Sequence, residues 1–305
     1  MKRTLLVLCL FLAAAPGAFA AKLRVVATVP ELVDITNRIG GSHVTVNGLA
    51  RGTEDIHQVT MRPSFVTLLN RADAVVYLGM SVEHAFLPGA LEVAANPKMR
   101  SDPSGCTGEA CIDCSEGLFV LEKPADLSRA QGELHPNGNP HYNVNPENGK
   151  LIAKNIAAGL SRLDPADKAD FEKNLKAYLD ELEPKIAEWK KEAAPLKGIK
   201  AVAFHKDTAY LAQFTGLDFI DTVEVKPGVA PTPTHLTALV QEMKDKGVKL
   251  LVREQQYDPK LAQWVADQTG AKVAVIGTMA NAFPGTDTFI KMSDHNIKAL
   301  VDATH

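Results

Sequence analysis

The chain has 305 residues, of which 46% are hydrophobic and 6% aromatic, and its formal net charge at pH 7 is −3. This mild acidity disfavours nucleic acid and anionic membrane surfaces as partners, because both attract basic proteins. The length is enough for one large domain or for two domains of ordinary size.

Residues 1–20 have the pattern of a secretory signal peptide. Lys2 and Arg3 form a basic start, an apolar run covers residues 4–15, and P-G-A-F-A ends in a small-residue cleavage site. The apolar run is too short to span a bilayer, and no second run in the chain reaches that length. We therefore expect cleavage after Ala20 and an exported, periplasmic protein.

The first half of the mature chain alternates β-branched runs with amphipathic stretches. The predicted strands are 23–28, 44–49 and 74–78, and the predicted helices are 30–39 and 64–70. Strands separated by helices at this spacing indicate parallel βαβ units. From about Pro97 to Pro146 the periodicity is lost and Gly, Pro, Asn and Ser are frequent, so we expect a long ordered loop there.

This irregular stretch contains Cys106, Cys111 and Cys114. In an oxidising compartment the expected arrangement is one small disulfide with one thiol left over. A thiolate metal cluster is the alternative, but C-x4-C-x2-C has no fourth partner nearby. The spacing leaves open which two cysteines pair.

A helix at 150–163 precedes a long helical pattern that begins at Asp164-Pro165. Its apolar residues fall three or four positions apart, as in an amphipathic helix, and a proline at 184 is expected to kink it. About 30 residues of helix measure about 45 Å, which is long enough to span two lobes. Residues 164–197 are therefore predicted to be a linking helix.

The alternation of strands and helices returns after residue 198. The predicted strands are 200–204, 219–225, 248–253 and 272–276, and the predicted helices are 208–214, 236–246, 259–269 and 288–303. The predicted fold is α/β, with two lobes that are each a parallel β-sheet flanked by helices and are joined by one long rigid helix. The predicted boundaries are 1–20 for the signal peptide, 21–163 for the N-terminal lobe, 164–197 for the linking helix and 198–305 for the C-terminal lobe.

Three histidines lie where predicted strands pass into loops: His57 in T-E-D-I-H, His141 in G-N-P-H-Y and His205 in A-V-A-F-H. Ligands of open parallel sheets bind beyond the carboxyl ends of the strands. Imidazole nitrogen is a preferred ligand of zinc, and three such ligands nearly fill a tetrahedral shell. These residues therefore predict a metal site with two ligands from one lobe and one from the other.

The other histidines are weaker candidates. His135 lies six residues before His141 and competes with it as a ligand, whereas His84 is expected to be structural. The remaining ones are expected at surface or helix positions: His43, His235, His295 and His305.

Several longer motifs carry a resemblance to a known family. They are V-V-A-T-V-P, D-I-H-Q-V-T-M-R-P-S, N-P-H-Y-N-V-N-P, F-H-K-D-T-A-Y-L-A-Q-F-T-G-L, L-L-V-R-E-Q-Q-Y and D-T-F-I-K-M-S-D-H-N. In order and spacing the chain resembles the metal-specific periplasmic solute-binding proteins of zinc and manganese ABC transporters. The resemblance implies two lobes joined by a rigid helix, with the metal buried between them. His57, His141 and His205 match the first three ligand positions of that family.

The resemblance also bears on which metal is bound. Manganese-type members are similar but have a carboxylate in place of the third histidine and another as the fourth ligand. This chain has His205 at the third position and no acid in the segment 277–281 that would match the fourth. Nitrogen donors favour zinc over manganese, so we expect Zn²⁺. The fourth ligand is left open between Glu224, Glu254, Asp55 and water.

The expected function is capture of Zn²⁺ outside the cytoplasmic membrane and delivery to an ABC transporter permease. We expect a monomer that binds no nucleic acid, and leave open whether a metallochaperone loads it. The alternatives are a manganese-specific solute-binding protein and a secreted three-histidine zinc hydrolase with Glu254 as general base. No H-E-x-x-H motif, nucleophile elbow or phosphate loop is present, so we expect a protein that is not an enzyme.

Overall fold

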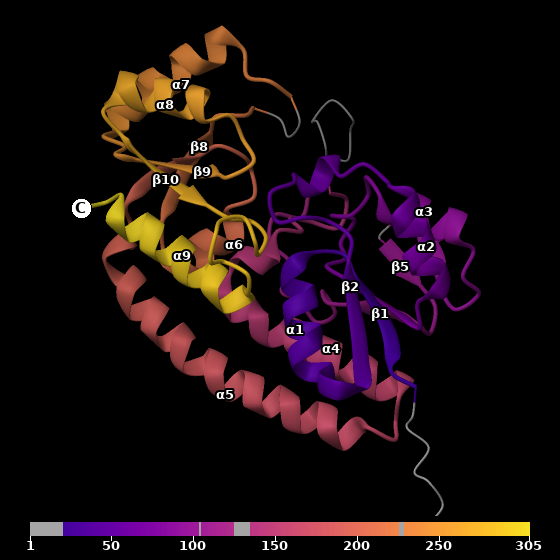
Figure 1. The fold of residues 1–305 in the computed structure, drawn as a ribbon. Coiled ribbons are helices and arrows are strands. Elements are labelled where there is room, and N and C mark those ends of the chain that lie inside the picture. The colour runs from indigo at the N-terminus through magenta and orange to yellow at the C-terminus, as the bar shows by residue number, and fades with distance from the viewer. Residues whose placement is uncertain (1–20, 104, 125–134, 226–228) are drawn as a thin grey trace, which may run out of the picture.

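A computed structural model describes residues 21–103, 105–124, 135–225 and 229–305 of the chain (Figure 1). The predicted signal peptide and its cleavage site lie outside these residues. Within the described ranges, no helix combines the length and the apolar character needed to cross a membrane.

The N-terminal sheet has four parallel strands in the order β2-β1-β3-β6. Their bounds are β1 Leu23–Ala27, β2 Val44–Gly48, β3 Ala74–Tyr77 and β6 Cys111–Asp113. The first three were predicted, because each is a β-branched run that becomes buried. The fourth corrects the expectation that the whole stretch 97–146 is a loop. A three-residue strand has no periodicity of its own, and β6 exists because β3 offers its free edge to it.

Four helices cover this sheet: α1 Pro30–Gly40, α2 Pro63–Arg71, α3 Leu87–Ala94 and α4 Gly149–Leu163. In α1 a proline occupies the first turn, where its missing N–H costs no hydrogen bond, and Leu32, Ile35 and Ile39 are fully buried at helical spacing. The short α3 was not predicted, because its sequence L-P-G-A-L-E-V-A has a proline, a glycine and no clear polar face.

An antiparallel hairpin, β4 Arg100–Asp102 and β5 Gly105–Thr107, leads into β6. Cys106 and Cys111 form a disulfide, with 5.8 Å between their Cα atoms, and Cys114 is a buried free thiol. The prediction of one disulfide and one unpaired thiol is confirmed. Burial raises the pKa of the Cys114 thiol well above its usual value, so this cysteine is held in its unreactive form.

The long helix α5, Lys168–Ala193, runs along the base of both lobes (Figure 1). It has 26 residues and begins four positions after the predicted start. The helix continues through Pro184, which is exposed, and Figure 1 shows it as one bowed element, not a broken one. Its buried side chains include Phe171 and Tyr178 in the first half and Trp189 near the end.

The C-terminal sheet is also parallel, in the order β10-β9-β7-β8. Its strands are β7 Lys200–Ala203, β8 Asp218–Thr222, β9 Leu250–Glu254 and β10 Lys272–Ile276, and its helices are α6 Ala209–Thr215, α7 Pro233–Lys246, α8 Pro259–Thr269 and α9 Phe289–Asp302. Each of these elements was predicted to within a few residues. The α/β architecture with two lobes and one long helix is therefore confirmed, whereas the residue numbers of the lobe boundaries stay a prediction.

Specific polar contacts tie the two lobes together. The Trp189 indole N–H on α5 donates to the Asp294 carboxylate on α9 over 2.6 Å. The buried Glu31 carboxylate on α1 accepts from Asn143 Nδ2 at 2.7 Å and from the Ala280 N–H at 3.1 Å. Burial raises the pKa of Glu31 to about 7, although the hydrogen bonds to its charged form act in the opposite direction and lower the pKa. The same carboxylate thus holds three separate segments of the chain.

A close contact between α4 and β6 provides a test of this packing. Gly159 faces Ile112, and a Cβ at position 159 would lie 2.6 Å from two carbons of that side chain. We predict that Gly159→Ala lowers the free energy of unfolding by about 1–3 kcal/mol, as overpacking does. Gly89→Ala on α3 is the matched control, because its Cβ would meet only Met61 Sδ at 3.7 Å. This control should gain up to about 1 kcal/mol from helix propensity. Urea denaturation measures both, and equal shifts would contradict the close packing.

Candidate metal centre

His57 is positioned by a short 3-10 turn in the loop after β2. Asp55 begins the turn and accepts from the His57 backbone N–H at 3.0 Å and from the Gln58 amide at 3.0 Å. Both oxygens of Asp55 are therefore engaged in holding its own turn. The His57 side chain is buried, with 6% of the residue exposed.

His141 is oriented by the residue two positions before it. Asn139 Oδ1 accepts from the His141 backbone N–H at 3.0 Å and lies 2.9 Å from the ring Nδ1. Nδ1 therefore carries the proton of the neutral ring and donates to Asn139, which leaves Nε2 as the electron pair donor. Asn139 is itself 6% exposed, so this hydrogen bond is shielded from water.

His205 follows β7 directly and is 3% exposed. Its Nδ1 lies 2.7 Å from Glu224 Oε2, a residue in the loop after β8. A carboxylate on the remote nitrogen of a histidine sets the tautomer and directs the other nitrogen away from it. Glu224, one of the sequence-based candidates for the fourth ligand, thus has the position of an orienting group behind His205.

The three predicted histidines lie together, although they come from segments far apart in the sequence. His57 Nε2 is 2.8 Å from His141 Nε2, and the His205 ring centroid is 5.7 Å from that of His57 and 5.6 Å from that of His141. Ligand atoms of a tetrahedral zinc ion lie about 3.3 Å apart, given zinc–nitrogen bonds of about 2.0–2.1 Å. The first pair is closer than that, at hydrogen-bond distance, and among the described residues the third histidine with a ligand atom within 4.8 Å of both is His135. His205 borders the pair from the other lobe at the ring distances given above.

Two further histidines border this group. The ring centroid of His135 is 5.0 Å from that of His57, and one ligand atom from each of His57, His135 and His141 lies within 4.8 Å of the others. His84, expected to be structural, has its ring 5.8 Å from His57 and 6.0 Å from His135, and its Nδ1 lies 3.0 Å from the Ser81 carbonyl. His84 lies in the segment after β3. The rule that ligands bind beyond the carboxyl ends of parallel strands, which pointed to the three predicted histidines, therefore applies to His84 as well.

Burial keeps two of the histidines uncharged. Desolvation, followed by the neighbouring histidines, lowers the pKa of His57 and His141 well below the usual value. For His205 desolvation acts in the same direction, but Glu224, Asp207 and Asp55 together outweigh it and raise the pKa. Metal ligation needs the neutral imidazole, so His57 and His141 are ready to bind at neutral pH and His205 is the one that competes with protons.

Sequence reasoning missed Asp207, which stands two residues after His205. Asp207 is 2% exposed and Glu254 is fully buried, and in the described chain Asp207 Oδ1 and both Glu254 oxygens have no hydrogen-bond partner other than the contact between these two side chains. Burial first, and then Asp207, raises the pKa of Glu254 well above the usual value. Buried carboxylates without partners are costly unless they hold a proton or face a cation. The pair therefore favours positive charge next to His205.

The cavity at this place is lined by residues of both lobes and is very small. Its volume is about 10 Å³, enough for one water molecule or ion. Its lining residues are Asp55, Ile56, His57, Leu78, Val82, His141, Asn143, His205, Asp207, Gln256, Tyr257, Thr278 and Met279. The segment 277–281, which carries no acid, contributes Thr278 and Met279 to this lining. An organic substrate does not fit, which disfavours the hydrolase alternative.

The same fold and sequence pattern occur in known metal-transport proteins. The family model of the zinc-uptake complex component A, periplasmic (ZnuA), matches residues 25–303. The manganese ABC transporter substrate-binding lipoprotein PsaA of Streptococcus mitis is 26% identical over 291 residues, which is 94% of this chain and 90% of that protein. The high-affinity zinc uptake system protein ZnuA of Brucella abortus is 29% identical over 163 residues, 53% of this chain and 49% of that protein.

A solved structure of a ZnuA deletion mutant with zinc bound is 28% identical and superimposes with a TM-score of 0.72, over 92% of this chain and 95% of that one. The relatives are substrate-binding proteins, not enzymes, and both zinc and manganese occur among them. Because the family model covers almost all of the mature chain, the protein belongs to the ZnuA/PsaA family of metal-binding substrate-binding proteins of ABC transporters.

Proposed function

We propose that this member of the family captures Zn²⁺ in the periplasm and that His57, His141 and His205 bind it through their free ring nitrogens. The observation that carries the proposal is an ion-sized cavity lined by imidazoles from both lobes, of which burial keeps His57 and His141 neutral. Three nitrogen donors favour zinc over manganese, which prefers oxygen. The buried pair of Asp207 and Glu254, whose pKa values are raised by burial, would be stabilised in its charged form by a cation on the His205 side.

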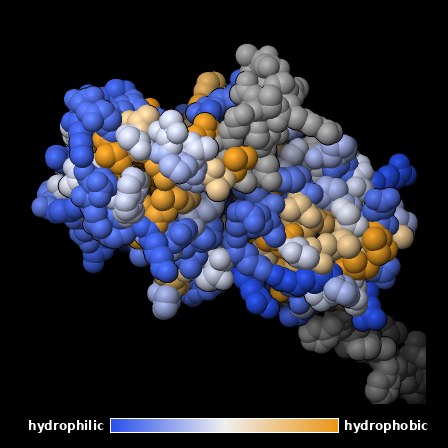
Figure 2. All heavy atoms as spheres, turned by 90° about the horizontal axis from the view of Figure 1, so that it is seen from above, coloured by the Kyte–Doolittle hydropathy of each residue, from blue (hydrophilic) through white to orange (hydrophobic). Residues whose placement is uncertain are grey.

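Substrate-binding components of ABC transporters work with a membrane permease, and we propose that this chain delivers zinc to such a permease. It would do so as a monomer, after the signal peptide has been cleaved following Ala20. Exposed apolar side chains stand close in sequence to the site on both lobes. Met61 is 40% exposed four residues after His57, and Val225, next to Glu224, is 54% exposed. Figure 2, which views the molecule from above, shows apolar patches over both lobes within a mostly hydrophilic surface. We assign this face to permease docking.

The choice of metal depends on His205. In competitive titrations the protein should bind Zn²⁺ more tightly than Mn²⁺ by at least about 100-fold, because each ligand is an imidazole. Loss of a group that orients a ligand costs about 10–100-fold in metal affinity. His205→Ala removes the ligand itself and should weaken zinc binding by more than that. His205→Glu, which supplies an oxygen ligand, should narrow the preference for zinc. His305→Ala at the exposed C-terminus is the control. Equal affinity of the natural protein for both metals would contradict the assignment of zinc.

The pH dependence should follow from the unequal pKa values of the histidines. His205 has a raised pKa and is protonated first as the pH falls, so zinc affinity should begin to drop above pH 6.5. His57 and His141 have lowered pKa values and should add to the loss only at more acidic pH.

Glu224→Gln tests this order. Removing the carboxylate takes away the first of the groups that raise the pKa of His205, so the drop in affinity should shift to lower pH. At pH 8 the variant should bind zinc about 10–100-fold more weakly, since the orienting charge is lost. Glu92→Gln, an exposed position on α3, serves as the control. An unchanged pH profile, measured by isothermal titration calorimetry from pH 5.5 to 8, would show that Glu224 does not act on His205.

His135 and His141 compete for one ligand position. Because Asn139 orients His141 and no such partner is described for His135, we expect His141→Ala to abolish high-affinity zinc binding and His135→Ala to weaken it by less than about tenfold. Zinc-induced stabilisation measures both, since a ligand at 100 times its Kd adds about 2.7 kcal/mol to the free energy of unfolding. The reverse order of effects would assign the position to His135.

A further inference from the structure

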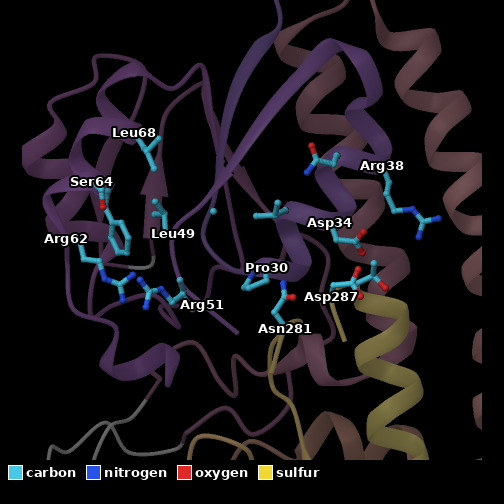
Figure 3. A pocket seen from close by; sticks show the side chains of 16 residues that line it. Pro30, Asp34, Arg38, Leu49, Arg51, Arg62, Ser64, Leu68, Asn281 and Asp287 are labelled. Atoms are coloured by element: carbon cyan, nitrogen blue, oxygen red, sulfur yellow. The ribbon is translucent and has the colours of Figure 1, made fainter. Parts of the chain in front are cut away.

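A second cavity, separate from the histidine site, lies between α1, α2 and the segment before α9 (Figure 3). Its volume is about 770 Å³, and none of its lining residues borders the histidine cavity. It is lined by Pro30, Val33, Asp34, Asn37, Arg38, Gly48, Leu49, Ala50, Arg51, Arg62, Ser64, Phe65, Leu68, Asn281, Asp287 and Thr288. Pockets for small molecules have volumes of about 300–1,000 Å³. We propose that this cavity binds a small organic carboxylate through Arg51 and Arg62.

The two arginines stand at the same end of the cavity. Figure 3 shows the side chains of Arg51 and Arg62 converging there, next to Ser64 at the start of α2. Arg62 is held in place by an ion pair with Glu54 and lies over the Phe65 ring, with its Cζ 5.2 Å from the ring centroid. Glu54 also accepts from the Arg51 backbone N–H at 2.8 Å, so its negative charge is engaged on the wall of the cavity.

Donors remain available at this end. Among the residues that the structure describes, the Arg51 guanidinium and the Ser64 hydroxyl have no hydrogen-bond or ion-pair partner. A guanidinium presents its N–H groups as a planar fork that matches a carboxylate. One arginine fixed by Glu54 and one with an open fork therefore form a recognition element for a carboxylate group.

The rest of the cavity selects for an organic ligand. Val33 and Leu68 line it and are only partly buried, so they offer apolar surface that inorganic phosphate would not use. At the other end Asp34 accepts from the Phe289 N–H at 3.0 Å, and Asp287 pairs with Lys291 at 2.8 Å. Arg38 lines this end as well, but its charge is paired with Glu181. The acids therefore repel a second negative group, and the ligand carries its carboxylate at one end and an apolar body towards the middle.

The cavity wall comes from both halves of the chain, which gives binding a structural consequence. Asn281 and Asp287 belong to the segment between β10 and α9, whereas Arg51 and Arg62 belong to the loop that contains His57. Next to Arg51, Gly52 packs so closely on that segment that a Cβ would lie 1.9 Å from the Ala280 carbonyl oxygen. A ligand here touches both walls and should stabilise their contact.

The test uses the mature full-length chain and valerate as the probe. With metal-free protein at constant ionic strength, calorimetry should give a Kd on the order of 1 mM, as a seven-heavy-atom ligand allows. Inorganic phosphate and pentylamine should bind at least about tenfold more weakly, because one lacks the apolar body and the other the carboxylate. Zinc-saturated protein should bind valerate too, so the result is independent of the proposed zinc function.

Arg51→Gln is the informative variant, since Arg51 is exposed and its side chain has no partner among described residues, so folding is preserved. It should weaken valerate binding at least about tenfold, the loss of one charge-assisted contact. Arg100→Gln, an exposed arginine on β4, should change nothing. The proposal is overturned if valerate does not bind, if Arg51→Gln binds it as well as the natural protein, or if phosphate binds equally well.

Discussion

The candidate metal centre depends on buried imidazoles where the two lobes meet. Desolvation lowers the pKa of His57 and His141 and so keeps both of these rings neutral. His205 is under the opposite influence, because Glu224, Asp207 and Asp55 raise its pKa. The site therefore combines two ligands that need no proton loss with a third that is sensitive to pH. A divalent cation would satisfy the neutral rings and the buried acids at once.

This arrangement requires that the lobes be held at a defined distance. The long α5 lies under both, and its Trp189 is tied to Asp294 on the last helix. On the other side of the interface, the Glu31 carboxylate joins α1 to the Asn143 and Ala280 segments. The Glu31 contact lies next to the cavity of about 10 Å³, because Asn143 lines that cavity and Ala280 follows the lining residue Met279. A frame fixed in this way allows small local adjustments around the ion and disfavours wide hinge opening.

The two cavities differ in the chemistry that they offer. The histidine cavity is ion-sized and bordered by three imidazole rings, whereas the one between α1 and α2 is large and has two guanidinium groups at one end. They meet through the loop that carries Arg51, Gly52 and His57, which packs on the Ala280 segment of the other lobe. A ligand in the inferred carboxylate site would thus stabilise the same contact between the lobes that a metal ion bound by His57, His141 and His205 would bridge.

The sequence by itself predicted most strands and most helices from local periodicity, and it singled out, from their places at strand ends, three histidines that line one cavity in the structure. It was not sufficient for β6 and α3, whose short sequences become regular only against a neighbouring strand or helix. Tertiary structure alone decided the Cys106–Cys111 pairing, the position of Glu224 behind His205, and the burial of Asp207 with Glu254. The physical reason is that these features are distances and desolvation between segments far apart in the chain, which no local pattern of residues encodes.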